Sequence, residues 1–216
     1  MVHNLSLSNS IINQYIAEIR DVEIQKDRWR FRKNLERIAQ VIAIEISKEL
    51  EYKNIPVTTP LGIADSKVLL NQPIVGTILR AGLPMHEGIL NIFDKADNAF
   101  ISAYRKHHKD HSFDIALEYV SSPSLDNRVL ILCDPMLATG SSFVLTFKAL
   151  LDRGKPKHTH IVCAIASKQG IDYLKKNMPD INYTIWCGAI DDELTSTAYI
   201  VPGLGDAGDL AFGEKL

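Results

Sequence analysis

The most informative segment of the chain is Val129-Leu-Ile-Leu-Cys-Asp134-Pro-Met-Leu-Ala-Thr139-Gly140-Ser141-Ser142. Its apolar start predicts a strand buried on both faces, and this strand runs directly into an acidic residue and a turn of small side chains. A helical pattern follows at 142–153. An acidic residue at the carboxyl end of such a strand points to the crevice where open α/β sheets bind ligands.

The turn after this strand suits a phosphate group. Thr139, Ser141 and Ser142 supply hydroxyl donors, and the free N–H groups and positive dipole end of the following helix attract an anion. Asp134 would then reach sugar hydroxyls or a magnesium ion. An N-cap at an ordinary strand–helix turn gives the same short pattern, so the turn alone leaves both interpretations open.

The chain after residue 70 repeats this alternation of strand and helix. Buried strands are also predicted at 74–79, 99–104, 161–166 and 183–187, and helices at 85–93 and 169–177. The alternation predicts an α/β fold with a five-stranded, mostly parallel sheet flanked by helices. An amphipathic helix at 26–50 precedes it, and 106–120 is a polar excursion or hairpin. The 216 residues suffice for one domain spanning 1–216.

Composition excludes several classes of protein. A net charge of −2 favours neither nucleic acid nor an anionic membrane as partner. No apolar run approaches the roughly 20 residues of a membrane helix, and the first residues do not resemble a signal peptide. Cys133, Cys163 and Cys187 lie in three different predicted strands, which indicates buried, reduced thiols. We therefore expect a cytoplasmic protein.

Basic side chains crowd the first half of the 26–50 helix. A solvated helix face is the simpler interpretation, and a site for an anionic effector or a subunit contact is the alternative. The basic residues concerned are Lys26, Arg28, Arg30, Arg32, Lys33 and Arg37.

Three segments, in order along the chain, resemble uracil phosphoribosyltransferases, which have the type I phosphoribosyltransferase fold. Asp134-Pro-Met-Leu-Ala-Thr-Gly resembles the motif that binds 5-phosphoribosyl 1-diphosphate (PRPP) in that family. Ile78-Leu-Arg80-Ala-Gly82-Leu resembles its diphosphate-binding loop. Tyr199-Ile-Val-Pro-Gly-Leu-Gly-Asp206-Ala-Gly-Asp209 resembles its uracil-binding segment. With Ile19-Arg20-Asp21 near the start, the resemblance covers nearly the whole chain.

The resemblance implies a pyrimidine salvage enzyme that transfers a phosphoribosyl group from PRPP to N1 of uracil, giving UMP and diphosphate. The implied catalytic residues are Arg80, Asp134 and Asp206. Uracil would be bound by Ile200, Gly205, Asp206 and Ala207. PRPP would be bound by a larger set: Arg80, Arg105, Asp134, Pro135, Met136, Leu137, Ala138, Thr139, Gly140, Ser141, Ser142 and Asp206.

The resemblance carries further implications. Mg²⁺ would be bound mainly through the PRPP diphosphate, with no metal site made of protein ligands alone. A non-proline cis peptide bond is expected between residues 79 and 82. The chain would form a homodimer or a larger homo-oligomer. GTP binding is associated with the family as well, and neither nucleic acid nor a membrane is an expected partner.

Some positions depart from the family pattern. Pro84 removes a backbone N–H near the diphosphate loop, Ser141 replaces a glycine, and Leu210 replaces a basic or larger polar residue. Basic and histidine residues at 106–111 stand where the family is acidic. Pro84 is compatible with an alternative function, a non-enzymatic sensor of PRPP or nucleotides on the same fold. The intact catalytic residues favour the enzyme.

Two other patterns do not support a site. Residues 203–208 match G-x-G-x-x-G, but only eight residues follow, too few for the βαβ unit that this dinucleotide-binding fingerprint requires. His107, His108 and His111 have a spacing that would bind a metal on a helix, yet their segment has no helical periodicity. We interpret them as part of a solvated loop.

Overall fold

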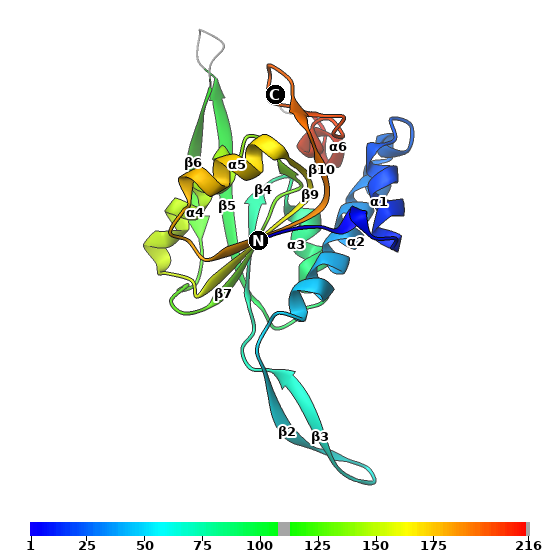
Figure 1. The fold of residues 1–216 in the computed structure, drawn as a ribbon, viewed down its shortest axis with the longest axis vertical. Helices are drawn as coiled ribbons and strands as arrows, with labels where there is room; N and C mark the ends of the chain where they lie inside the picture. Colours follow the sequence, from blue (N-terminus) through cyan, green and yellow to red (C-terminus); the bar gives the residue numbers. More distant parts are fainter. Residues whose placement is uncertain (108–112, 215–216) are drawn as a thin grey trace.

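The structure, a computed structural model, describes residues 1–107 and 113–214, and for 103–107 and 113–117 it describes the backbone alone. One large sheet forms its centre, with strand order β1-β10-β9-β7-β4-β5-β6 and the short β8 beside β9 (Figure 1). The strands are β1 (Val2–Asn4), β4 (Ile74–Leu79), β5 (Asp97–His107), β6 (Phe113–Ser121), β7 (Val129–Cys133), β8 (Met136–Leu137), β9 (His158–Ser167) and β10 (Tyr183–Asp191).

The predicted α/β class and its five strands are confirmed, and the sheet is wider than predicted. All neighbouring strands described in this sheet are parallel, except that β6 returns antiparallel to β5. β1, β6 and β8 are the additions to the predicted strands. Two of these are only two or three residues long, too short to produce a periodic signal.

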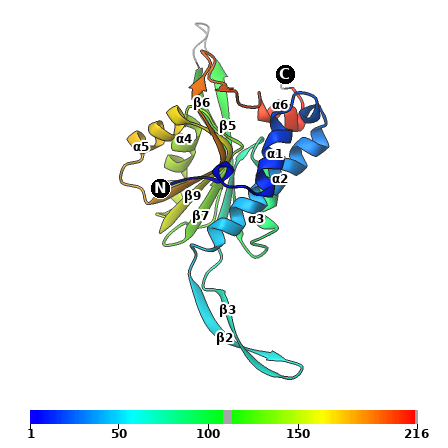
Figure 2. The same cartoon turned by 45° about the vertical axis from the view of Figure 1, so that its right-hand side comes forward.

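Helices cover both faces of the sheet, as Figures 1 and 2 show. One face packs against α1 (Ile11–Arg20), α2 (Arg28–Ser47) and α3 (Leu83–Leu90), and the other against α4 (Ser141–Leu150) and α5 (Lys168–Asn177). Successive side chains of a strand serve opposite layers. In β7, Ile131 belongs to the α1–α3 core, whereas Leu130 and Leu132 belong to the α4–α5 core. None of the helices in the described part of the chain is long and apolar enough to cross a membrane.

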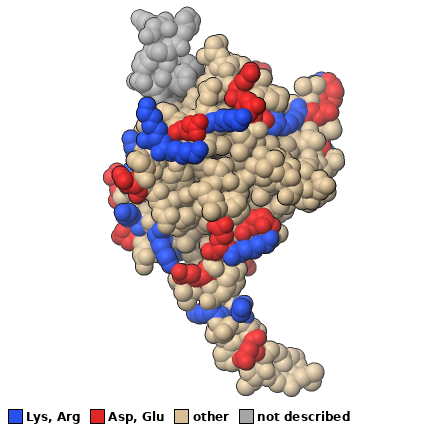
Figure 3. Space-filling view, in the orientation of Figure 1, with Lys and Arg blue, Asp and Glu red and all other residues tan. Residues whose placement is uncertain are grey.

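The segment between α2 and β4 forms a two-stranded arm that extends away from the sheet (Figures 1 and 2). β2 (Tyr52–Thr59) and β3 (Gly62–Leu69) pair antiparallel with one another in a separate sheet. Twelve of the sixteen residues in these strands are exposed and none is buried. Leu61, at the turn between them, is also exposed, and the space-filling view in Figure 3 shows the arm standing clear of the rest of the molecule. The sequence analysis predicts no strand in this segment, because an arm without a buried face has no hydrophobic periodicity.

All three cysteines are buried free thiols, as predicted. Burial raises the pKa of the Cys133 thiol to about 12, and burial also raises the pKa of Cys163 well above its usual value. A neutral, enclosed thiol is a poor nucleophile, so the structure gives neither residue the environment of a catalytic cysteine.

The contact between α3 and α2 depends on a glycine. A Cβ atom built on Gly88 would overlap the Glu36 carbonyl oxygen and would lie 2.9 Å from the Ala39 Cβ atom. The two helices therefore approach more closely than any side chain at position 88 would allow. The turn that follows β4 leads directly into α3.

We expect Gly88→Ala to lower the free energy of unfolding by about 1–3 kcal/mol, the usual cost of overpacking a close contact. Glu87→Ala, at the exposed neighbouring position, is the matched control and should change stability by less than about 0.5 kcal/mol. Chemical denaturation of both variants checks this. Stabilisation by Gly88→Ala, the sign expected from helix propensity alone, would contradict the close contact.

Candidate active site

The candidate site lies at the carboxyl ends of β4 and β7, which are neighbours in the sheet. The helix after β4 packs on one face of the sheet and the helix after β7 packs on the other. The two connecting segments therefore diverge at this point, which leaves the crevice that α/β sheets use for ligands. Arg80 immediately follows β4 and Asp134 immediately follows β7. The structure thus brings together the two residues on which the sequence prediction most depends.

The turn that contains Arg80 packs closely against the end of β7. A Cβ atom on Gly82 would lie 2.8 Å from the Ile78 carbonyl oxygen and 3.0 Å from the Cys133 carbonyl oxygen, so only glycine fits there. The peptide bond between Leu79 and Arg80 is cis, which confirms the prediction for residues 79–82. Pro84 lies in the first turn of α3, where a backbone N–H has no acceptor within the helix, so it does not disturb α3.

The segment after Asp134 is attached to β9 through its backbone. The Pro135 carbonyl accepts from the N–H groups of Ala164 and Ile165, both at 3.0 Å, and the Ala138 carbonyl accepts from the Ser167 hydroxyl at 2.5 Å. These bonds hold the inner side of the segment and place Thr139–Ser142 at the start of α4. The predicted phosphate-binding residues therefore form one continuous turn.

Gly140 shapes the end of this turn. Its φ of 82° lies in the left-handed region that favours glycine. A Cβ atom there would lie 2.8 Å from the Gly170 carbonyl oxygen, at the start of α5. Gly140, the N-cap residue of α4, makes no side-chain cap; the Thr139 hydroxyl lies 2.7 Å from the Ser141 hydroxyl and accepts from the Ser141 N–H at 3.4 Å. Hydroxyls next to an uncapped helix start are an arrangement that suits an anion.

The C-terminal segment reaches the same edge of the sheet. It comprises β11 (Glu193–Leu194), β12 (Ile200–Val201) and α6 (Ala207–Phe212), the last of which lies close to α1 and α2 in Figures 1 and 2. Ile200 and Ala207 are buried, whereas Gly205 is exposed. The predicted uracil-binding residues thus lie in β12 and in the turn that leads from it to α6. Apart from Asp206, their side chains are apolar or absent, so the polar groups that they present are backbone groups.

An ion pair that the sequence interpretation missed holds this segment in place. Arg20 donates to both carboxylate oxygens of Asp191 at 2.8 Å and to the Gly203 carbonyl at 3.0 Å. The Gly203 N–H donates to Asp191 at 2.9 Å in return. Asp191 ends a buried strand, as Asp134 follows one, so the same rule could have identified it.

Asp206 and Asp209 have linked roles at the start of α6. Oδ1 of Asp206 accepts from the Asp209 N–H at 3.0 Å and so caps the helix. The Asp209 carboxylate accepts from Nη2 of Arg80 at 2.7 Å. The same Nη2 donates to the Gly213 carbonyl at 2.6 Å. The predicted base-binding segment is therefore tied directly to the predicted diphosphate-binding arginine.

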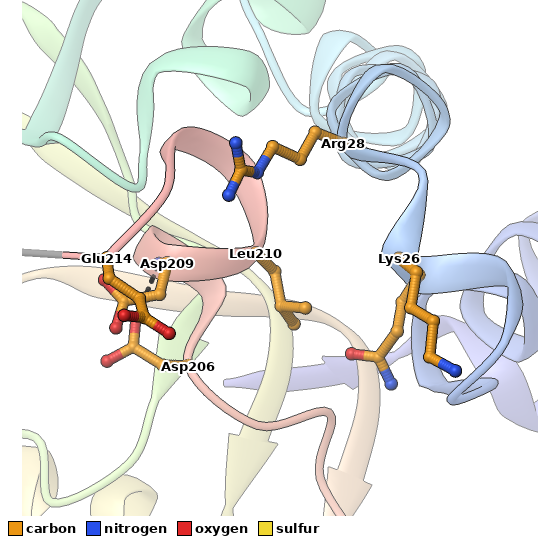
Figure 4. A pocket seen from close by; sticks show the side chains of 7 residues that line it. Lys26, Arg28, Asp206, Asp209, Leu210 and Glu214 are labelled. Atoms are coloured by element: carbon orange, nitrogen blue, oxygen red, sulfur yellow. Dashed lines mark hydrogen bonds between the residues drawn. The ribbon is translucent and has the colours of Figure 1, made fainter.

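A pocket of about 350 Å³ adjoins this contact (Figure 4). Three carboxylates gather on its α6 side, and the opposite side is formed by the start of α2 and the residues before it. Leu210, which replaces a more polar family residue, occupies the space between these two sides. The lining residues are Gln25, Lys26, Arg28, Asp206, Asp209, Leu210 and Glu214.

Several basic residues of α2 hold neighbouring elements within the same chain. Arg30 donates to both oxygens of the buried Glu18 carboxylate on α1. The side-chain hydrogen bond from Arg30 is the largest cause that lowers the pKa of Glu18 to about 2. Arg32 donates to the Ala211 carbonyl at 2.7 Å, and Lys33 bonds Glu36. Arg30 and Arg32 are therefore more than a solvated face, since they attach α1 and α6 to α2, whereas the Lys33 pair lies within α2.

Two sequence predictions concern residues that the structure describes only in part or not at all. Arg105, the predicted second diphosphate contact, lies in β5 opposite Ile115 of β6, and its side chain is outside the described part. His108 and His111 lie outside the described residues, as does the His107 side chain. Within the residues that the structure describes, no group of three or more His, Cys, Asp or Glu side chains is placed to hold a metal ion.

Known proteins resemble this chain over its whole length. The sequence model of the uracil phosphoribosyltransferase family matches residues 6–214. A uracil phosphoribosyltransferase from Porphyromonas gingivalis is 54% identical over 215 residues, covering 100% of this chain and 99% of the relative. One from Methanothermobacter thermautotrophicus is 35% identical, covering 96% and 94%. The solved structure of the AQ2163 protein from Aquifex aeolicus superposes with a TM-score of 0.87 at 27% identity, covering 99% and 98%.

Proposed function

The chain belongs to the uracil phosphoribosyltransferase family, and we propose that Arg80, Asp134 and Asp206 carry its reaction. It is a pyrimidine salvage enzyme that converts uracil and PRPP to UMP and diphosphate. The observation that carries the assignment of residues is the single edge of the sheet at which the Arg80 turn, the turn after Asp134 and the α6 segment meet. The sensor alternative is set aside, because the whole chain matches enzymes.

PRPP would lie across this edge with its two charged ends on different turns. The 5-phosphate suits the hydroxyls and N–H groups of Thr139–Ser142, and the ribose hydroxyls suit the Asp134 carboxylate. The diphosphate suits the positively charged guanidinium group of Arg80, whose N–H groups form charge-assisted hydrogen bonds with phosphate oxygens. We assign Arg105 as a second contact to the diphosphate, on the strength of the family pattern.

Magnesium fits this arrangement as a companion of the diphosphate. Asp134 and Asp206 are the carboxylates that would face the ion, and Mg²⁺ commonly uses one or two carboxylates together with substrate phosphates. When bound, the ion would offset the charge that the diphosphate gains on leaving. Arg80 performs the same task from the protein, by hydrogen bonds that strengthen as the leaving oxygen becomes more negative.

The reaction exchanges one bond at C1 of the ribose for another. The bond from C1 to the diphosphate oxygen breaks, the bond from uracil N1 to C1 forms, and N1 loses its proton. We assign the Asp206 carboxylate as the acceptor of the N1 proton, since it belongs to the base-binding turn and is linked through Asp209 to Arg80. Fixed turns hold both reactants, so positioning and electrostatic stabilisation account for most of the catalysis.

We propose that the enzyme works in the cytoplasm as a homodimer or larger homo-oligomer. Three unpaired, buried cysteines suit a reducing compartment. The β2–β3 arm supports the oligomer, because Leu61 is 100% exposed and Ile63 is 76% exposed. An apolar tip on an arm that extends from the molecule is explained by burial against a second copy.

Replacing the proposed PRPP contacts should impair turnover and leave the fold unchanged. Arg80→Ala removes a charge-assisted hydrogen bond, and Asp134→Asn removes a charge at constant shape. Each should lower kcat/KM for PRPP by at least about tenfold, which corresponds to 1.4 kcal/mol or more. Steady-state kinetics with circular dichroism as the folding control tests both variants. Wild-type kinetics in either one would remove that residue from the mechanism.

The base site should accept uracil and exclude cytosine. Backbone groups have fixed polarity, and the N3 and C4 positions of cytosine present the opposite polarity to uracil. Two unpaired groups at about 1–3 kcal/mol each predict a kcat/KM ratio of roughly 10²–10⁴. 5-Fluorouracil, which keeps the uracil edge, is the matched control and should react. A uracil-to-cytosine ratio below about ten, or a preference for a purine, would contradict this assignment.

Light scattering tests the oligomer directly. The wild-type protein should have at least twice the 24.1 kDa mass of one chain at micromolar concentration. Leu61→Asp combined with Ile63→Asp should shift the population toward the monomer, since it places charge on the apolar tip. Thr58→Asp, on the same arm, serves as the control for added charge. A wild-type protein that stays at 24.1 kDa would refute the proposal.

A further inference from the structure

Asp209 connects the two halves of the site through a single residue. Its carboxylate binds Nη2 of Arg80, and its backbone N–H binds the Asp206 carboxylate. We propose that Asp209 is a positioning residue that fixes the Arg80 guanidinium group, so that its Nε edge is presented to the diphosphate of PRPP. This inference rests on the proposed role of Arg80 as the diphosphate contact.

The hydrogen bonds of Arg80 explain how its orientation is set. Nη2 carries two hydrogens, and it has two acceptors, Asp209 Oδ1 at 2.7 Å and the Gly213 carbonyl at 2.6 Å. Both acceptors belong to the α6 segment. Because the guanidinium group is planar and rigid, fixing one terminal nitrogen in two directions fixes the whole plane.

The remaining edge of the guanidinium group lacks an acceptor. Nε of Arg80 is buried and has no hydrogen-bond partner in the described part of the chain. Buried donors in folded proteins are almost always paired, so a lone one calls for an explanation. A diphosphate oxygen supplies the missing acceptor without displacing Asp209, because the two interactions use different nitrogens.

Gly208 lies next to both Nε of Arg80 and the Asp206 carboxylate. A Cβ atom on Gly208 would lie 3.8 Å from Arg80 Nε and 3.2 Å from Asp206 Oδ1. A side chain at position 208 would therefore crowd both groups. The proposed diphosphate contact and the base-side carboxylate are adjacent there.

The partial exposure of this ion pair indicates orientation rather than stability as its main effect. The side chains of Arg80 and Asp209 are 33% and 35% exposed. Ion pairs at such positions contribute little to the free energy of folding. The pair formed by Arg128 and Asp97 is similar, with the arginine also 33% exposed and also bonded to a backbone carbonyl, but it lies at the opposite ends of the strands.

The test compares Asp209→Ala with Asp209→Asn and with Asp97→Ala as the matched control. Asp209→Ala should raise the KM for PRPP by about 10- to 100-fold, the usual effect of misplacing a binding group by about 1 Å. The KM for uracil at saturating PRPP should change by less than about threefold, since the Asp209 N–H that binds Asp206 is retained. Asp209→Asn keeps an acceptor oxygen and should recover most of the PRPP affinity. Asp97→Ala should leave both KM values unchanged.

Combining Asp209→Ala with Arg80→Ala separates this inference from the assignment on which it rests. If Asp209 acts through Arg80, its replacement should add less than about threefold to the effect of Arg80→Ala on kcat/KM for PRPP. An effect of Arg80→Ala without one of Asp209→Ala would refute the positioning role alone. A lower KM for PRPP in Asp209→Ala would refute it as well, because Asp209 would then compete with the substrate. No effect of Arg80→Ala would refute the diphosphate assignment itself.

Discussion

The parallel pairing of β4 with β7 is the constraint on which the site depends. Its register, from Ile74 opposite Leu130 to Thr77 opposite Cys133, brings two distant parts of the chain to the same edge of the sheet. The segments that follow the two strands are short, and they lead to helices on opposite faces of the sheet. Arg80 and Asp134 are neighbours in space for this reason, and a shift of register would separate them.

The C-terminal segment completes the site because two arginines hold it there. Arg20 binds Asp191 and Gly203 on the β12 side, and Arg80 binds Asp209 and Gly213 on the α6 side. Between these attachments lies the turn that we propose binds the base through backbone groups. The segment is therefore fixed at both ends while its centre stays available to a ligand, which is the preorganisation that catalysis by positioning requires.

The sequence predicted the parts of the structure that have local patterns. Buried strands appear as apolar runs, and the acidic residue after 129–133 marks the ligand edge, so the core and Asp134 could be found without a structure. The β2–β3 arm has no buried face and therefore no pattern. The bond from Arg80 to Asp209 joins residues 129 positions apart, and no local signal encodes it. The family resemblance supplied Arg80 and Asp206, which spacing alone would not have singled out.

Hydrogen exchange measured by mass spectrometry, with and without PRPP and Mg²⁺, tests most directly whether the three segments form one site. If they do, PRPP without uracil should slow amide exchange in 79–83, in 134–142 and in 205–210 together, because Arg80 and Asp209 connect the diphosphate to the base-binding turn. The arm at 52–69 should exchange at an unchanged rate. Protection confined to 134–142 would show that PRPP binds the phosphate turn alone, and the account of a single site shared by Arg80, Asp134 and Asp206 would be wrong.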